Sequence, residues 1–536
     1  MTNASSRVQE WFAARTRWQT RGIAAGAGVL ATLAHAPFQF TLLYAVALVV
    51  LVWLLDAAFA RERRVRAAFG VGLWFGLGHF VTGVYWISSA VMVAAAAWGP
   101  IWGVPAVLAL AGILALFWAG GCALAMLAWT RDLRRIPVFA VALFASEWLR
   151  GHLFGGLPWL LPGYVWTPGE PVSQMAALIG AYGLSLITLF LLAAPATMFD
   201  AGVGAGRRFA PMVVAGLFAG MMWGWGAQRI ASAAIDLPGA QPIVRVADSG
   251  LSQRQKGEGR TDQEWRVLAR YLDASGAPDE SRAAVVIWPE GAIPWVNFPM
   301  LENPEFMDAV GRGMGDRVLI AGVTRRELGA DRYLFYNSAA VIDGVSGTPR
   351  LSQVYDKHRL VPWGEFIPLW RLVSPLNIAP LQRIGKGFEV GDPPTRLVVP
   401  EAPPAVVLIC YEAIFPGLTP RGDERPGWIV SVTNDAWFGK GTGPWQHYAM
   451  ARYRSIEEGL PMARAASGGV SAIVDAYGRP VREARGAVLF AEAQLPPALP
   501  ATIYAQYGTL LLALLTVIIA SLRLLLPAPV SRELSP

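Results

Sequence analysis

The sequence predicts a polytopic α-helical membrane protein of about eight spans that also carries an extracytoplasmic α/β domain. The chain has 536 residues, is 54% hydrophobic and has a positive mean hydropathy, so it is too long for one domain and too apolar to be wholly soluble. Long uncharged apolar segments fill the first 227 residues. The region from about 240 to 500 instead shows the alternating strand and helix patterns of a globular α/β domain.

Eight apolar segments are too long and too uncharged to be helices of a soluble protein. They lie at about 22–36, 41–59, 68–91, 100–128, 136–150, 173–198, 209–227 and 505–526. The first leads directly into further segments, which argues against a cleaved signal peptide. We therefore expect three parts: an N-terminal membrane domain of seven helices (1–229), a globular domain (230–503), and a C-terminal helix with a cytoplasmic tail (504–536).

Basic residues indicate the orientation of these spans. Nearly all are arginines, and they gather before the first segment and after the second, fourth and sixth: Arg7, Arg15, Arg17, Arg21, Arg61, Arg63, Arg64, Arg66, Arg131, Arg134, Arg135, Arg207 and Arg208. The loops at about 37–40, 92–99 and 151–172 contain no lysine or arginine. By the positive-inside rule, both termini lie in the cytoplasm and the region of about 230–500 lies on the outer side.

The composition argues against several classes of site. The two cysteines, Cys122 and Cys410, are far apart and have no metal-type or CxxC partner, so we expect neither a disulfide framework nor a zinc site. The net charge of +7 does not come from a basic stripe, so no nucleic-acid partner is expected. We predict no metal and no cofactor.

Glu147 and Arg150 place two opposite charges near the outer end of the fifth predicted span. An ionisable residue inside a membrane is a candidate for function, but a pair of opposite charges near the interface can be purely structural. The sequence leaves both interpretations open.

The globular region reads as an α/β domain with a mixed or largely parallel sheet. Seven segments have the apolar, branched composition of strands: 242–247, 283–288, 318–323, 338–342, 354–355, 405–409 and 428–433. Helical patterns cover 261–275, 303–313 and 444–458. Glu290, Lys357 and Cys410 follow predicted strands, and the carboxyl ends of strands are where open α/β sheets place their chemistry.

Cys410 is the candidate nucleophile, although a lone cysteine is more often an inert core thiol. A thiol with an ordinary pKa of about 8.5 is mostly protonated near neutrality, so it needs a base to take its proton and a cation to favour the thiolate. Glu290 can supply the base and Lys357 the cation. The lysine can also stabilise the oxyanion of a tetrahedral intermediate, as acyl transfer requires.

Three motifs resemble the Glu-Lys-Cys triad of the nitrilase superfamily in order and approximate spacing: Trp288-Pro289-Glu290, the run from Tyr355 through Lys357 to Glu365, and Cys410-Tyr411-Glu412. The longer run TNDAWFG at 433–439, which continues through GPWQH to Arg452, is similar to the apolipoprotein N-acyltransferase family, the membrane-bound branch of that superfamily. The resemblance covers essentially the whole chain, because that family also combines eight spans with one extracytoplasmic nitrilase-like domain.

The resemblance implies an αββα sandwich and a role for each triad residue. Glu290 would be the general base, Cys410 the thiol that becomes acylated, and Lys357 the stabiliser of the tetrahedral intermediate. Supporting roles are implied for four further residues: Glu365, Tyr411, Glu412 and Asn337. Trp363 is one of several aromatic residues near these motifs that suit contact with acyl chains or the bilayer, with a core position as the alternative.

The activity implied by the resemblance is transfer of a fatty acyl chain from a phospholipid, through a thioester, to the α-amino group of the diacylglyceryl-cysteine of an apolipoprotein. The implied location is the bacterial inner membrane, with the catalytic domain in the periplasm, and we expect a monomer. Two alternatives stay open: a membrane-tethered amidase that uses water as acceptor, and a transporter with a non-catalytic domain. Segment 248–256 lacks the Gln-Gly pair that the resemblance implies after the first strand. The resemblance therefore assigns no substrate contacts to this segment.

Overall fold

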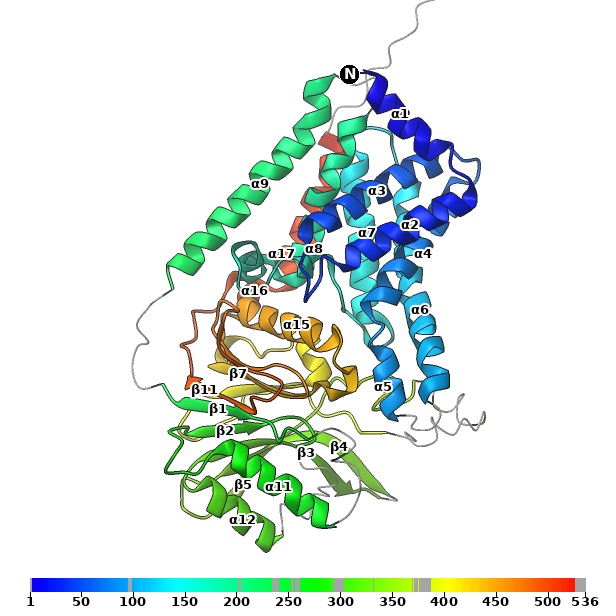
Figure 1. Cartoon of the computed structure of the whole chain (residues 1–536). Coiled ribbons are helices and arrows are strands. Elements are labelled where there is room, and N and C mark those ends of the chain that lie inside the picture. The colour runs from blue at the N-terminus through cyan, green and yellow to red at the C-terminus, as the bar shows by residue number, and fades with distance from the viewer. Residues whose placement is uncertain are drawn as a thin grey trace, which may run out of the picture. The chain divides into compact units, whose positions relative to one another are not determined.

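The computed structural model describes residues 2–94, 99–200, 204–233, 241–251, 255, 261–292, 303–330, 332–368, 370, 375 and 387–525. Packing contacts divide the chain into two compact units (Figure 1). A helical unit comprises residues 1–85, 104–231 and 507–536, and an α/β unit comprises residues 86–103 and 232–506. The α/β unit therefore includes a short segment, 86–103, that is distant in sequence from its main body.

The helical unit is built from helices, most of which are apolar. They are α1 (Thr2–Ala13), α2 (Arg17–Thr32), α3 (Thr41–Phe59), α4 (Arg64–Gly83), most of α6 (Gly99–Leu127), α7 (Arg135–His152), α8 (Ala176–Ala193), α9 (Ala205–Ala231) and α17 (Thr509–Leu525). Within the described residues, four helical stretches are long and apolar enough to cross a membrane: Thr41–Phe59, Ile101–Leu127, Pro171–Phe199 and Ala205–Ala231. A fifth is added if α4 and the next helix form one broken span, so the count of about eight stays a prediction.

The predicted span at 68–91 is broken in the structure. α4 ends at Gly83, and a separate helix, α5 (Ile87–Ala94), begins after Trp86. Hydropathy does not show this break because the sequence is apolar on both sides. Trp86 explains it: the indole Nε1 donates to Oε1 of Gln446 at 3.1 Å, and the ring packs against Phe438 with centroids 4.5 Å apart. These contacts make Trp86 part of the α/β unit.

Glu147 and Arg150 form a buried ion pair one turn apart on α7. Trp118 Nε1 and Arg150 Nε both donate to Oε1 of Glu147, at 2.8 and 3.0 Å. The guanidinium also donates to the carbonyl of Leu157 and lies over the ring of Phe80. Because the pair connects α7 to two other helices and to the following loop, the structural interpretation is favoured over a functional one.

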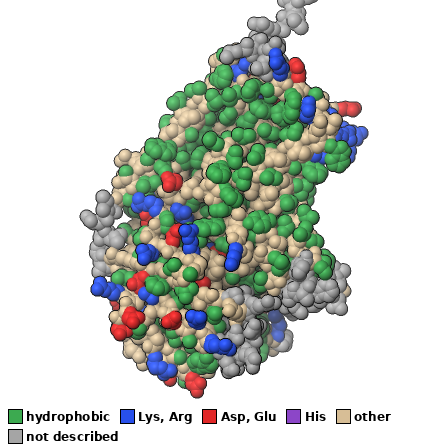
Figure 2. Space-filling model, viewed as in Figure 1, with side chains coloured by type: hydrophobic (Ala, Val, Ile, Leu, Met, Phe, Trp, Pro, Cys, Tyr) green, Lys and Arg blue, Asp and Glu red, His purple; other side chains and the backbone are tan. Residues whose placement is uncertain are grey.

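The two units differ in surface chemistry. On the face shown in Figure 2, hydrophobic side chains dominate the helical unit, whereas charged side chains gather on the α/β unit. Large apolar side chains on the helices are exposed, including Leu42, Val104, Leu108, Val214 and Leu217. Apolar surface of this extent fits a lipid environment better than water.

The described part of the α/β unit contains two mixed sheets, with strand orders β11-β1-β2-β3-β4-β5 and β10-β9-β8-β7-β6. The strands β1, β2 and β3 run parallel, as do β6, β7 and β8, and the other neighbours are antiparallel. Their bounds are β1 (Ile243–Ala247), β2 (Val285–Trp288), β3 (Val318–Leu328), β4 (Tyr333–Asp343), β5 (Arg350–Asp356), β6 (Ala405–Ile409), β7 (Trp428–Asn434), β8 (Met462–Ser467), β9 (Ser471–Val474), β10 (Pro480–Ala484) and β11 (Phe490–Gln494).

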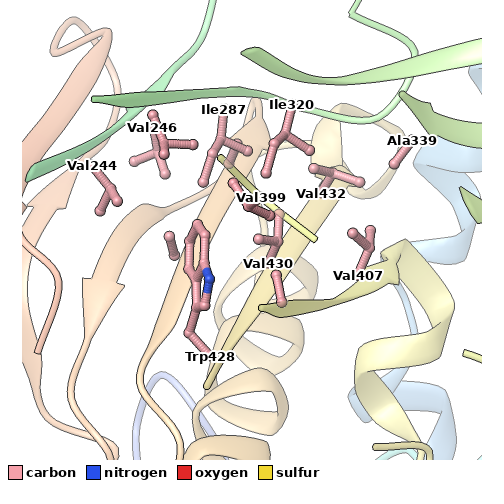
Figure 3. Packing of buried hydrophobic residues seen from close by; sticks show 14 of the residues in the cluster. Val244, Val246, Ile287, Ile320, Ala339, Val399, Val407, Trp428, Val430 and Val432 are labelled. Atoms are coloured by element: carbon pink, nitrogen blue, oxygen red, sulfur yellow. The ribbon is translucent and has the colours of Figure 1, made fainter. Parts of the chain in front are cut away.

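Three apolar clusters arrange these sheets into four layers. Between the sheets, Val246 and Ile287 of the first pack in one cluster with Val407 and Val430 of the second (Figure 3). The outer face of the first sheet packs against α11 (Thr261–Ser275) and α12 (Pro304–Met314), and that of the second against α15 (Gly443–Glu458). The parallel strands β1, β2, β6, β7 and β8 are buried along almost their whole length, as expected for such strands, whereas the antiparallel strand β10 is mostly exposed. The expected αββα sandwich is confirmed.

Candidate active site

Three strands deliver the predicted catalytic residues to one place. Glu290 follows β2 and Lys357 follows β5 in the first sheet, whereas Cys410 follows β6 in the second. Nζ of Lys357 lies 3.3 Å from Oε1 of Glu290, and the Cys410 thiol interacts electrostatically with both groups. The structure therefore brings together the three residues that the sequence singles out.

Glu290 is held by hydrogen bonds on both carboxylate oxygens. Oε1 accepts from Nζ of Lys357 and from Nδ2 of Asn337 (2.7 Å), and Oε2 accepts from the backbone N–H of Asn434 (2.9 Å). A carboxylate fixed in this way is an oriented proton acceptor for the neighbouring thiol.

Lys357 is buried between two carboxylates. Nζ contacts Oε1 of Glu365 at 2.9 Å in addition to its contact with Glu290. Burial by itself lowers the pKa of Lys357, but Glu290 and Glu365 together raise it above its ordinary value. The side chain is therefore a fixed ammonium ion, which can stabilise a negative charge that develops on a substrate.

Asn337 and Glu365 contact the triad directly. Asn337, on β4, donates through Nδ2 to Oε1 of Glu290 and to Oε1 of Glu365, the second at 2.6 Å. The other oxygen of Glu365 accepts from the backbone N–H of Val361 at 2.8 Å. The Asn337 amide thus bridges the two carboxylates that flank Lys357.

Cys410 begins a 3-10 turn, η8 (Cys410–Ile414), with a backbone φ of +50°. Residues other than glycine rarely adopt this conformation, and such strain is concentrated at functional sites. Burial raises the pKa of the Cys410 thiol, Glu290 raises it further, and the opposing effect of Lys357 is smaller. Lys357 by itself therefore does not favour the thiolate, because burial and Glu290 together outweigh the ammonium ion, and the roles of Glu290 as base and Lys357 as cation stay predictions. The thiol is protonated until a base accepts its proton.

Glu412 is buried and connects the two sheets. Its carboxylate accepts hydrogen bonds of 2.7 to 3.1 Å from the Tyr355 hydroxyl and from the backbone N–H groups of Ile409, His358 and Arg359. Burial raises the pKa of Glu412 above its ordinary value, although these donors oppose that effect. The contacts join the end of β6, which carries Cys410, to the loop after β5, which carries Lys357.

The other two predicted residues differ in exposure. Tyr411 is buried and packs edge-on against Phe415, with ring centroids 5.0 Å apart. Trp363 is 53% exposed and has a φ of +65°, while its backbone N–H donates to the carbonyl of Phe366 at 2.7 Å. A large aromatic side chain held at the surface of the loop that also carries Glu365 suits contact with an apolar ligand.

Sequence reasoning gave no role to a buried polar group next to Cys410. Its members are Thr433, Asp435, His447 and Arg464. Three of them, Thr433, Asp435 and His447, belong to the 433–452 run quoted for its family resemblance, and that resemblance is the signal that could have found them. Of segment 248–256, only 248–251 and 255 lie among the described residues.

The fold and these contacts define a class: a carbon–nitrogen hydrolase-type αββα domain, with a thiol, a carboxylate and a lysine close together, in a chain that also contains apolar helices. Residues 245–495 match the family described as Carbon-nitrogen hydrolase, and residues 27–194 match the Apolipoprotein N-acyltransferase N-terminal domain. The chain belongs to the apolipoprotein N-acyltransferase family.

Several curated relatives support this membership over nearly the full length. A Rhodopseudomonas palustris protein named Apolipoprotein N-acyltransferase is 38% identical over 98% of each chain. Proteins of the same name from Bradyrhizobium diazoefficiens and Caulobacter vibrioides are 39% and 36% identical, over 92% and 93% of each chain. The resemblance inferred from the motifs is therefore confirmed for both units.

Proposed function

We propose that this protein transfers a fatty acyl chain from a phospholipid to the α-amino group of the diacylglyceryl-cysteine at the N-terminus of an apolipoprotein. The observation that carries the proposal is the cluster of Cys410, Glu290 and Lys357 in a chain whose relatives are named Apolipoprotein N-acyltransferase. A thioester at Cys410 links the two substrates, because one pocket can then serve donor and acceptor in turn. This chemistry uses no metal and no cofactor.

In the first half-reaction, Glu290 takes the Sγ proton of Cys410 while the sulfur attacks the ester carbonyl carbon of the phospholipid. The carbonyl oxygen becomes an oxyanion, which the ammonium group of Lys357 stabilises. When the tetrahedral intermediate collapses, the ester C–O bond breaks and Glu290 gives the proton to the leaving oxygen. A lysophospholipid departs, and the acyl group stays on Cys410 as a thioester.

In the second half-reaction, the α-amino nitrogen of the acceptor attacks the thioester carbonyl. Glu290 accepts a proton from the amine, the C–S bond breaks, and that proton passes to the sulfur. The raised pKa of the Cys410 thiol favours this last transfer, so the site returns to its protonated state. An amide bond to the acceptor has formed, and Lys357 has stabilised an oxyanion in both half-reactions.

Five further residues support this chemistry. Asn337 and Glu365 fix the positions of Glu290 and Lys357 through the contacts described above. Glu412 fixes the spacing between the two loops that carry the nucleophile and the lysine. We assign Trp363 to contact with an acyl chain, because it is exposed and lies close in sequence to Glu365. Tyr411 supports the turn that follows Cys410 by packing on Phe415.

The membrane setting of this reaction rests on the arginine pattern and the apolar helices. The proposal includes eight spans in the inner membrane of a bacterium, with both termini in the cytoplasm and the catalytic domain (230–503) in the periplasm. A membrane domain (1–229) precedes it, and a single helix with a tail (504–536) follows it. The enzyme is proposed to act as a monomer.

Mass spectrometry of the purified protein tests the proposal. Incubation in detergent micelles with a phospholipid of defined chain length should add that acyl mass to the peptide containing Cys410. A synthetic diacylated lipopeptide with a free α-amine should then remove the adduct and gain the acyl group. The variant Cys122→Ala is the matched control and should still form the adduct, because Cys122 lies buried in the helical unit. An adduct that forms but is released only as free fatty acid would show that water is the acceptor, and the protein would then be a hydrolase instead of an N-acyltransferase.

A further inference from the structure

A buried histidine contacts the backbone of the proposed nucleophile. His447, on α15, is fully buried, and its Nε2 lies 3.1 Å from the carbonyl oxygen of Cys410. A carbonyl oxygen can only accept a hydrogen bond, so Nε2 carries the proton and donates it. This contact joins α15, which covers the second sheet, to the strained residue that directly follows strand β6 of that sheet.

The orientation of the imidazole ring is itself fixed. Nδ1 of His447 lies 2.8 Å from Oδ1 of Asp435, and Arg464 donates to the other carboxylate oxygen at 2.8 Å. Thr433 donates to Oδ1 at 2.9 Å. Burial by itself raises the pKa of Asp435, but Arg464 and His447 lower it overall, so the carboxylate is ionised and accepts from its neighbours. The ring cannot turn without breaking contacts on both sides.

These contacts hold a conformation that Cys410 would not adopt by itself. A φ of +50° is unfavourable for a residue with a Cβ, and such conformations persist only where the surroundings determine them. The direction of the Cα–Cβ bond, and with it the place of Sγ relative to Glu290 and Lys357, depends on this backbone. A hydrogen bond to the Cys410 carbonyl therefore acts on the position of the thiol without touching it.

We propose that His447, oriented by Asp435, is a positioning residue that fixes the strained backbone of Cys410 and thereby directs its thiol toward Glu290 and the substrate carbonyl. The inference rests on the proposed function, in which Cys410 is the nucleophile. It predicts a defect in the rate of the acylation step and not in phospholipid binding.

The test compares three variants at this position and its neighbour in the full-length protein in detergent micelles. In His447→Leu the ring donor is lost, whereas the side-chain amide of His447→Gln can still donate to the carbonyl. Tyr448→Phe is the matched control: it removes one partly buried hydrogen bond of the same helix, from the Tyr448 hydroxyl to Glu483 (2.7 Å). The measurements are the thermal midpoint, the single-turnover rate of acyl adduct formation, the phospholipid KM, and the rate at which iodoacetamide alkylates Cys410.

We expect His447→Leu to slow adduct formation by about 10- to 100-fold at unchanged KM, as small misplacements of reacting groups do. The rate at which iodoacetamide alkylates Cys410 should differ from that of the parent as well, because this rate depends on the position and surroundings of Sγ and does not require acyl transfer. His447→Gln should recover most of the rate, and Tyr448→Phe should stay within about twofold of the parent.

Three results would overturn the inference. One is a His447→Leu variant that forms the adduct at the parent rate, in which case the proposed function stands and the positioning role fails. The second is a His447→Gln variant no faster than His447→Leu at equal thermal midpoint. The third is a parent protein that forms no adduct on Cys410, which would remove the proposed function together with the inference.

Discussion

Replacement of Lys357 by arginine should nearly abolish acyl transfer, although it keeps the positive charge. The ammonium group occupies a buried space between Oε1 of Glu365 at 2.9 Å and Oε1 of Glu290 at 3.3 Å. A guanidinium is planar, wider and longer, so it cannot satisfy both contacts from the same backbone position without displacing the thiol or the substrate oxyanion. Loss of one oxyanion donor typically costs about 10²–10³ in rate, and we expect a decrease of at least that order.

The companion variant Lys357→Met separates charge from shape. It removes the cation and leaves the carboxylates of Glu290 and Glu365 without compensation, which typically destabilises a fold by about 3–5 kcal/mol. The double variant Lys357→Met/Glu365→Gln should recover much of that stability but none of the activity, because the oxyanion donor is still absent. Urea unfolding in micelles measures the first effect, and transfer from phospholipid to a diacylated lipopeptide measures the second.

Activity of Lys357→Arg within about threefold of the parent, measured on folded protein, would refute this reasoning. The position would then supply only charge, and the role of oxyanion stabiliser would have to be withdrawn from Lys357.

Three further outcomes are expected. Cys410→Ser should abolish turnover because an alkoxide is far harder to form than a thiolate, and Glu290→Gln should do so because an amide accepts no proton. Near-normal transfer by either variant would show that the triad is wrongly assigned. The rate of Cys410 alkylation should keep rising with pH above about 8.5, since burial and Glu290 raise the pKa of this thiol and the reactive thiolate appears only at higher pH; a plateau below pH 8 would contradict this. Reporter fusions at Gly206 and Gly276 should label opposite sides of the membrane, as the arginine pattern requires, and labelling on the same side would disprove the assigned spans.

Much of the fold was predictable because apolar, branched residues mark buried strands in any context. All seven predicted strands are found, and β3 and β4 are longer than expected because their polar ends continue pairing beyond the core. The strands β8 to β11 were not predicted. The sequence of β8, MARAAS, is buried along its whole length but consists mainly of small residues, and an arginine interrupts it. Its burial comes from packing between neighbouring strands, which composition does not express.

The candidate site was predictable to the extent that each residue follows its own strand. The sequence placed Glu290, Lys357 and Cys410 at strand ends, and the sandwich brings these ends together. The bridging contact of Asn337 and the contact of His447 with Cys410 depend on how separate elements pack. The raised pKa of the Cys410 thiol could not be predicted from the sequence either, because it depends on burial in the folded domain, which no local sequence pattern indicates.

The segment around Trp86 bears on how the two units can be separated in the laboratory. The Trp86 ring lies so close to Gly443 that a Cβ added to this glycine would come within 3 Å of the ring. Ser89 is equally close to Gly439. An α/β domain expressed from residue 232 onward would therefore lack a part of its own surface, with Phe438 uncovered beside the start of α15. Joining residues 86–94 to that fragment by a flexible linker, or supplying them as a peptide, should restore the missing packing and give a more soluble domain. The α/β unit is thus made of two stretches of sequence that are far apart in the gene. A single truncation of the chain cannot isolate it.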